Sequence, residues 1–105
     1  MSPFNIFITH ISWKGGSKSH PVLVIQINGN TVSVYPITTQ YKNKSKAIQA
    51  LYFKINDWVQ AGLDKQSYID TGTILDIPLM VFQNKQPIGK LTTADMQRLL
   101  VFLSN

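Results

Sequence analysis

Two β-branched stretches separated by an Asn-Gly pair dominate the first half of the chain. Val22–Ile27 is almost entirely apolar and follows a proline, which indicates a strand buried on both faces. Thr31–Ile37 alternates apolar and polar side chains, which is typical of a strand with two different faces. Asn28 and Gly29 lie between them and favour a type I′ turn, because both residues accept positive φ. The pattern therefore predicts an antiparallel hairpin.

Further strands are expected on both sides of this hairpin. Phe4–Trp13 carries apolar side chains on both faces and predicts a buried strand. Ile48–Ile55 alternates again, and Ser67–Ile74 predicts another short strand. The stretches Lys14–Ser19 and Thr38–Lys46 are polar and rich in glycine, serine or lysine, so they are expected to be loops.

Helical signals are confined to two places. Asn56–Gly62 predicts one helical turn that Gly62 closes. Thr92 to Asp95 has the form of a capping box. The apolar stripe that follows predicts a C-terminal helix packed on the core, with a partner's groove as the alternative: Met96, Leu99, Leu100 and Leu103. The expected fold, over a single domain of residues 1–105, is mainly β with a C-terminal α-helix, and such a sheet closes most easily as a small, partly open antiparallel barrel.

Charge is unevenly distributed along the 105 residues, whose net charge is +5. The first 56 residues contain six lysines and no acid, and all five aspartates lie in the remainder. A positive field that no acid cancels favours polyanions such as nucleic acid, although lysines can also simply keep a small domain soluble. No apolar run is long enough for a membrane span and no secretory signal is evident, so we expect no membrane association and a cytoplasmic location.

The inventory of reactive side chains is short. The chain has no cysteine and no glutamate, and His10 and His20 lack the spacing of metal ligands. We therefore expect no metal site and no cofactor, and chemistry that needs paired carboxylates is disfavoured. One reaction remains open, because RNA can be cut by its own 2′-hydroxyl if the protein supplies a proton-transfer group and donors for the phosphate.

The predicted hairpin brings such groups together. Since its strands are antiparallel, the start of one lies beside the end of the other, which places His20 and Thr38 at the same end. Lys14 and Lys18 precede His20 along the chain. The alternatives are a surface histidine that flanks a loop and a threonine that merely ends a strand. His10 alternates with apolar residues and is expected to be half-buried and hydrogen-bonded.

Four stretches carry motifs of one known family, in the family's order: Gly15–Ile25, Tyr35–Thr39, Ala61–Ile69 and Ile88–Met96. The first resembles a glycine-rich loop followed by Arg-Pro-Val-Leu-Val-Ile, and the second an Ile-Thr-Ser/Thr strand end. The third resembles an Ala-Gly-Leu-x-Lys-x-Ser segment, and the fourth a Gly-Lys/Arg-Leu-Ser entry to the last helix. In these motifs the chain resembles the MazF/PemK family of small toxins from bacterial toxin–antitoxin pairs. Together the stretches span nearly the whole chain.

The resemblance implies an SH3-like barrel, usually a homodimer, that cleaves single-stranded RNA without a metal ion. It also implies inhibition by a small antitoxin protein whose disordered tail covers the RNA site. In the family, the arginine before the proline and the threonine that ends the next strand carry catalysis, and these positions are His20 and Thr38 here. The expected RNA-binding residues are Lys14, Lys18, Thr39, Gln40, Lys42 and Lys44.

The chain departs from the family at the first catalytic position. Arginine is always charged and binds phosphate with a fork of donors, whereas histidine titrates near neutral pH. Three outcomes stay open: His20 acts as a base or acid with Lys14 or Lys18 supplying charge, activity is weak and pH-dependent, or the protein binds RNA or an antitoxin without cutting. Trp13 and Tyr41 are candidates for base stacking or for packing.

Overall fold

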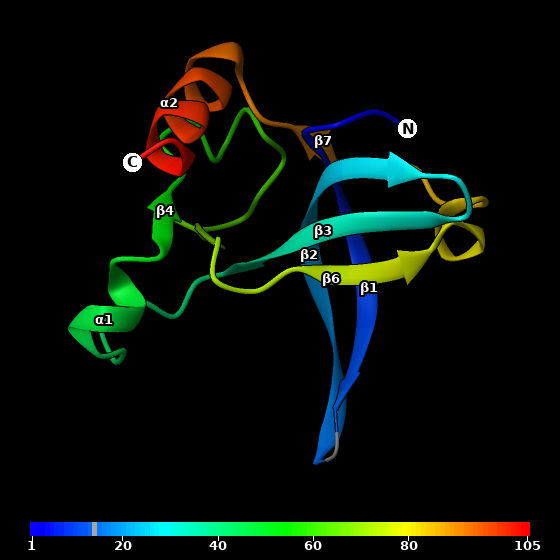
Figure 1. Cartoon of the computed structure of the whole chain (residues 1–105), viewed down its shortest axis with the longest axis horizontal. Helices are drawn as coiled ribbons and strands as arrows, with labels where there is room; N and C mark the ends of the chain where they lie inside the picture. The colour runs from blue at the N-terminus through cyan, green and yellow to red at the C-terminus, as the bar shows by residue number, and fades with distance from the viewer. Residues whose placement is uncertain (14) are drawn as a thin grey trace.

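A curled, seven-stranded antiparallel sheet and a C-terminal helix form the fold (Figure 1). The computed structural model describes residues 1–13 and 15–105, with residues 11–13 as backbone only. The strand order is β4-β5-β3-β2-β1-β7, and β6 also pairs with β3. The elements are β1 (Asn5–Trp13), β2 (Gly16–Asn28), β3 (Thr31–Thr38), α1 (Lys46–Gln49), β4 (Tyr52–Lys54), β5 (Tyr68–Asp70), β6 (Leu75–Pro78), the 3₁₀ turn η1 (Leu79–Phe82), β7 (Gly89–Lys90) and α2 (Thr93–Leu103).

The predicted class, mainly β with a C-terminal helix on a partly open barrel, is confirmed. The predicted hairpin is also present, as β2 and β3. Its two-residue turn is Gly29 and Asn30, one position later than expected, and only Gly29 has positive φ. A β-bulge between Val24 and Gln26 shifts the register on the β2 side. None of the described helices is long and apolar enough to cross a membrane.

β3 changes partners along its length, and this change positions the site. On one edge it pairs with β2 as far as Val22 and Pro36. On its other edge the first half pairs with β6, and the last two residues, Ile37 and Thr38, pair with β5. The end of β3 therefore leaves β2 and turns toward the small sheet of β4 and β5.

β1 and β2 form an arm that extends from the body of the molecule (Figure 1). Their ladder continues to Ser12 opposite Ser17 and Trp13 opposite Gly16. The loop predicted over Lys14–Ser19 is therefore wrong from Gly16 onward, because pairing with β1 outweighs the weak strand preference of glycine and serine. Lys14 lies outside the described residues.

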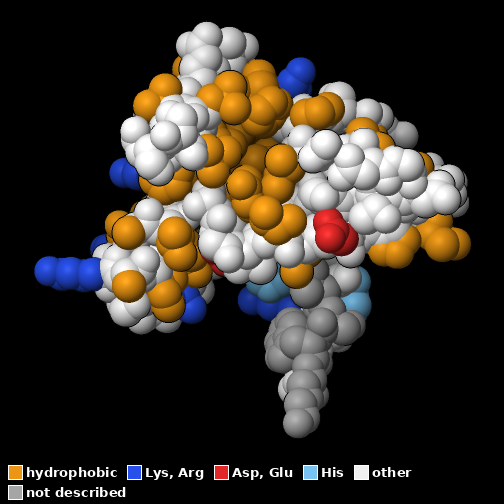
Figure 2. Space-filling view, viewed as in Figure 1, with side chains coloured by type: hydrophobic (Ala, Val, Ile, Leu, Met, Phe, Trp, Pro, Cys, Tyr) orange, Lys and Arg blue, Asp and Glu red, His pale blue; other side chains and the backbone are white. Residues whose placement is uncertain are grey.

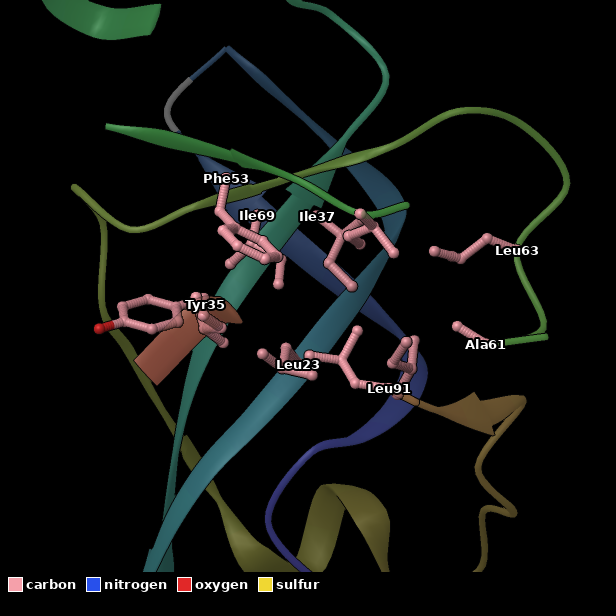
Figure 3. Packing of buried hydrophobic residues seen from close by; sticks show 11 residues of the cluster. Leu23, Tyr35, Ile37, Phe53, Ala61, Leu63, Ile69 and Leu91 are labelled. Atoms are coloured by element: carbon pink, nitrogen blue, oxygen red, sulfur yellow. The ribbon is translucent and has the colours of Figure 1, made fainter. Parts of the chain in front are cut away.

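Buried side chains form two clusters, one on each face of the central strands. The first core includes Ile6, Leu23 and Leu99, and Figure 3 shows its packing. The second core lies between the sheet and η1, and consists of Phe7, Val22, Val24, Val32, Val34 and Phe82. Val22–Val24 is thus buried on both faces as predicted, whereas Gln26 and Ile27 are exposed.

Ile48–Ile55 is not the single strand that its alternation predicts. Ser45 caps a short helix, α1, by accepting the Ile48 N–H, and only Tyr52–Lys54 is strand. The side chains of Ile48 and Leu51 are exposed, so their apolar character does not mark a buried face. The N-cap at Ser45 therefore favours a helix over the strand that the alternation predicts.

Ser67–Ile74 is only partly strand. β5 ends at Asp70, whose carboxylate accepts the N–H of Gly72 and so starts a turn. Ile74 is 61% exposed. The strand β6 and the turn η1 beyond it were not predicted.

The capping box opens α2 as predicted: the Thr92 hydroxyl accepts the Asp95 N–H at 3.2 Å. The Asp95 carboxylate is buried and also accepts the backbone N–H groups of Asn56 and Asp57, at 3.3 and 2.8 Å. The guanidinium of Arg98 donates to the same carboxylate. These bonds tie the start of α2 to the segment after β4.

The apolar stripe of α2 is less buried than predicted. Leu99 belongs to the first core, and Met96 and Phe102 pack against it. Leu100 and Leu103, however, are 56% and 41% exposed. The helix lies at the edge of the sheet rather than under a further layer (Figure 1), so these side chains have nothing to pack on within the described chain.

Two glycines allow the turn after β4 to touch the strand β7. Gly62 has φ +89, and a Cβ there would lie 2.2 Å from the carbonyl oxygen of Ile88. A Cβ on Gly89 would lie 1.9 Å from the carbonyl oxygen of Ala61. The segment Asn56–Gly62 forms hydrogen-bonded turns rather than a regular helix, and Gly62 closes it as predicted.

Candidate functional site

His20 and Thr38 line one pocket of about 230 Å³. His20 lies in β2, two residues before the last β2–β3 pair, and Thr38 lies two residues after it in β3. Strand side chains alternate between faces, so continuing this register places both on the face that carries Val22 and Pro36. The structure therefore brings together the two side chains that the hairpin predicted to meet.

The Thr38 hydroxyl is oriented by the backbone. Its oxygen accepts the N–H of Gln40 at 3.0 Å. A hydroxyl can accept and donate at once, so this bond leaves its proton available to a ligand oxygen in the pocket. The chain turns sharply after β3, which is why the N–H two residues later can reach back.

Asp70 and Tyr52 also line this pocket, and the sequence did not predict either of them. Thr38 pairs with Tyr68, and Tyr52 pairs with Asp70, so the alternation along β5 puts all four on one face. The Asp70 carboxylate accepts the Gly72 N–H and the Thr73 hydroxyl, both at 2.9 Å. An acid from the second half of the chain therefore lies beside the basic site, so the expectation that no acid cancels its positive field is wrong at this pocket.

Tyr52 has a raised pKa. Burial disfavours the phenolate, and the negative charge of Asp70 disfavours it further. The phenol therefore keeps its proton at neutral pH and can donate it in a hydrogen bond. The pocket thus offers three donor groups, on His20, Thr38 and Tyr52, beside one carboxylate.

A second depression of about 460 Å³ holds three of the expected RNA-binding residues, Thr39, Gln40 and Lys42. It is lined as well by Tyr41, Asn43, Gln66 and Tyr68. Because Tyr68 pairs with Thr38, this depression adjoins the first pocket. The Tyr41 ring stacks on Tyr68 with centroids 4.4 Å apart, so one face of Tyr41 is used in packing.

The other expected RNA-binding residues lie apart from these depressions. Lys18 is exposed on the arm, opposite Ile11 in the β1–β2 ladder. Lys44 lies beyond Tyr41, whose carbonyl oxygen accepts its backbone N–H. Lys14 and the Trp13 side chain lie outside the described part of the chain. Figure 2 shows histidine and lysine side chains near the base of the arm.

His10 is exposed, so the half-buried position predicted for it is wrong. It lies in β1 opposite Ser19, one residue from Thr9 and therefore on the other face of the sheet from His20. Of the two histidines, only His20 lines the pocket with Thr38.

A depression of about 690 Å³ lies elsewhere, along α2. It is mostly apolar and contains Phe53, Val101 and Phe102, with Lys54 and Arg98 at its polar end. None of the predicted site residues lines it. In the described part of the chain, no three His, Cys, Asp or Glu side chains form a group that could hold a metal ion.

Comparisons with known proteins agree with the motifs. The model of a family described as PemK-like, MazF-like toxin of type II toxin-antitoxin system matches residues 2–104. Among solved structures, the chain is similar to the Mycobacterium tuberculosis toxin MazF-mt6, with 22% sequence identity and a TM-score of 0.70 over 96% of this chain and 93% of that chain. At this identity the likeness shows the fold alone. No curated protein matches the chain.

Proposed function

Because the chain belongs to the family of PemK-like, MazF-like toxins of type II toxin–antitoxin systems, we propose that it is the toxin of such a pair and cleaves single-stranded RNA without a metal ion. The observation that carries this proposal is that His20 and Thr38 line one pocket, beside a depression that contains Thr39, Gln40 and Lys42. A cytoplasmic location, where messenger RNA is available, is part of the proposal.

The pocket supports a reaction in which the RNA cuts itself. The 2′-hydroxyl attacks the adjacent phosphorus, a 2′,3′-cyclic phosphate forms, and the bond to the 5′-oxygen of the next nucleotide breaks. His20 takes the proton of the attacking hydroxyl while water protonates the leaving oxygen, or His20 protonates the leaving oxygen while water takes the proton of the attacking hydroxyl. The Thr38 hydroxyl donates to a non-bridging phosphate oxygen, where negative charge develops in the transition state.

The depression next to the pocket gives the RNA a path. Amide and hydroxyl groups of Thr39 and Gln40 can bond nucleotides, and Lys42 adds positive charge. Lys44 on the same loop and Lys18 on the arm would steer the phosphate backbone toward this surface, and we propose the same role for Lys14, which lies between β1 and β2 in the sequence. We also propose the partners usual in the family, a second copy of the chain and an antitoxin protein.

A second candidate function is RNA or antitoxin binding without cleavage. The observation that favours it is the composition of the pocket in which the phosphate would bind. A histidine stands there where the family has an arginine, and Asp70 adds a carboxylate. A carboxylate repels a phosphate, and an imidazole supplies less charge than a guanidinium. This candidate predicts salt-sensitive RNA binding that leaves the RNA intact.

The two candidates separate in a cleavage assay with a labelled single-stranded RNA in EDTA. Under the proposed mechanism the wild-type protein produces fragments that end in 2′,3′-cyclic phosphate. Substituting alanine for His20 or Thr38 is expected to lower the rate by about 100-fold or more, the usual contribution of a proton-transfer group or a charge-stabilising donor.

The chain offers a matched control for each variant. His10→Ala removes the other histidine, which lies on the opposite face of the sheet. Thr31→Ala removes the threonine at the far end of β3. Both controls should cleave like the wild type. Intact RNA with every protein, together with measurable RNA affinity, would reject cleavage in favour of the second candidate.

A further inference from the structure

One buried hydroxyl close to His20 has no partner. Thr9 is 1% exposed. Its Oγ1 is the one buried side-chain polar atom of the described residues that lacks a hydrogen bond. Burying an unpaired hydroxyl costs about 1–3 kcal/mol, so a native structure seldom keeps one without a use for it.

Thr9 lies directly opposite His20 in the ladder between β1 and β2. Paired residues of antiparallel strands share a face of the sheet, with Cβ atoms about 4.5–5.5 Å apart. Two residues earlier on the same face, Phe7 is opposite Val22, and both belong to the second core. Thr9 and His20 therefore continue this face of the sheet beyond the second core, and no hydrogen bond joins their side chains in this structure.

We propose that Thr9 is a positioning residue for His20. A rotation of the imidazole brings one ring nitrogen to the unpaired hydroxyl of Thr9, the two form a hydrogen bond, and the other ring nitrogen is thereby turned to the pocket. The consequence for catalysis rests on the proposed function, whereas the hydrogen bond itself does not.

A hydroxyl suits this task in both states of the ring. A neutral imidazole has one N–H and one free lone pair, and the partner of one nitrogen decides which nitrogen keeps the proton. A hydroxyl that accepts behind the ring keeps the proton on the rear nitrogen, so the front nitrogen can act as a base. A hydroxyl that donates keeps the proton on the front nitrogen, which can act as an acid, and either bond favours one tautomer. When the ring is protonated, both nitrogens donate, and the same oxygen still accepts.

The first test measures the ring itself, in the free protein. Nitrogen-15 NMR at a pH where histidine is neutral reports which ring nitrogen carries the proton. In the wild type we expect His20 to favour one tautomer strongly and the exposed His10, the internal reference, to show the mixture of free histidine. Thr9→Val should move His20 toward that mixture, and Thr9→Ser should retain the wild-type preference.

The second test measures cleavage by the same variants. Thr9→Val should lower kcat about tenfold with little change in KM, since one hydrogen bond to the base is lost and the RNA contacts remain. Thr9→Ser should restore most of the rate. Thr31→Val, the same change at the far end of β3, should have no effect.

A purely structural role for Thr9 predicts different results. Because the hydroxyl is unpaired, replacing it with a methyl group should leave the free energy of unfolding unchanged or raise it. A His20 ring with the same tautomer mixture as His10 in the wild type would overturn the proposal, and so would a His20 signal that Thr9→Val leaves unaltered. If the tautomer shifts as expected but no protein cleaves RNA, the proposed function fails and the positioning role stands.

Discussion

Two aspartates of this chain, Asp95 and Asp70, show how differently the same side chain can be used. Asp95 is buried and accepts hydrogen bonds from two backbone N–H groups of another segment and from Arg98. Asp70 is half-buried at the pocket and accepts hydrogen bonds from the N–H of Gly72 and the hydroxyl of Thr73, both in its own turn. Asp95 therefore joins two segments that are distant in the sequence, whereas Asp70 stabilises only its own turn.

The difference indicates which carboxylate belongs to the fold and which to the site. Burying a charge is tolerated when several donors compensate it, as around Asp95, and removing it then leaves those donors unpaired. Asp70 remains beside a cavity that it shares with His20 and Thr38. Its charge can therefore act on a ligand or on neighbouring side chains, with little effect on folding.

The largest expected effect is on stability. Asp95→Ala should lower the free energy of unfolding by about 3 kcal/mol, because it leaves two backbone N–H groups and a guanidinium without the buried carboxylate that accepts from them. Asp70→Ala should lower it by less than about 1 kcal/mol, since it loses two bonds within a partly exposed turn. Urea unfolding followed by circular dichroism measures both. Equal losses in the two variants would contradict the distinction drawn between these residues.

A smaller effect is expected on ligand binding. Asp70→Asn removes one negative charge from the pocket and should raise the affinity for a single-stranded RNA that carries non-cleavable 2′-deoxy linkages by about fivefold at low salt. Fluorescence anisotropy measures this affinity. Asp76→Asn is the matched control, because Asp76 is exposed on β6 and bonded to Ser33. An equal gain in both variants would show that the effect comes from net charge and not from the pocket.

The smallest effect is on the titration of Tyr52. Its pKa is raised above the ordinary value of 10.0 by burial first and by the charge of Asp70 second. Asp70→Asn should therefore lower the pKa of Tyr52, although burial keeps it above 10.0. Ultraviolet titration of the tyrosinate band measures this, with Tyr52→Phe identifying the signal. An unchanged pKa would mean that Asp70 does not act on this part of the pocket.

The raised pKa of Tyr52 also makes the free energy of unfolding depend on pH. The folded protein holds the Tyr52 proton more tightly than the unfolded chain does. The resulting contribution to stability is fully present below the unfolded pKa near 10 and is lost as the pH rises through the higher pKa of the folded state.

Local signals predicted the strand pair that matters most. A proline at the strand start, the β-branched run and the Asn-Gly pair were sufficient to place His20 and Thr38 at one end of a hairpin. The capping box at Thr92 was equally readable, because its hydrogen bond joins residues three apart. Such features are formed by residues that are close together in the sequence, so they can be predicted from the sequence alone.

The rest of the site depends on contacts between distant segments. Asp70 enters the pocket because β5 pairs with the end of β3, more than thirty residues earlier. An alternating pattern gives the two faces of a strand but not the strand it will pair with. For the same reason, the distribution of charge along the sequence did not indicate that an aspartate of the second half lies in the pocket. The alternation over Ile48–Ile55 predicted one strand and did not indicate the helix that Ser45 caps.

The close approach of Gly62 and Gly89 affects how genetic data on this protein should be interpreted. At either position a side chain would collide with the backbone of the other segment, so every replacement damages the packing of the turn after β4 against β7. Under the proposed function, a selection for survivors of induced expression would therefore recover substitutions at these glycines along with those at His20 and Thr38. Soluble yield of each survivor would separate the two groups, and only survivors that accumulate at normal levels report on chemistry.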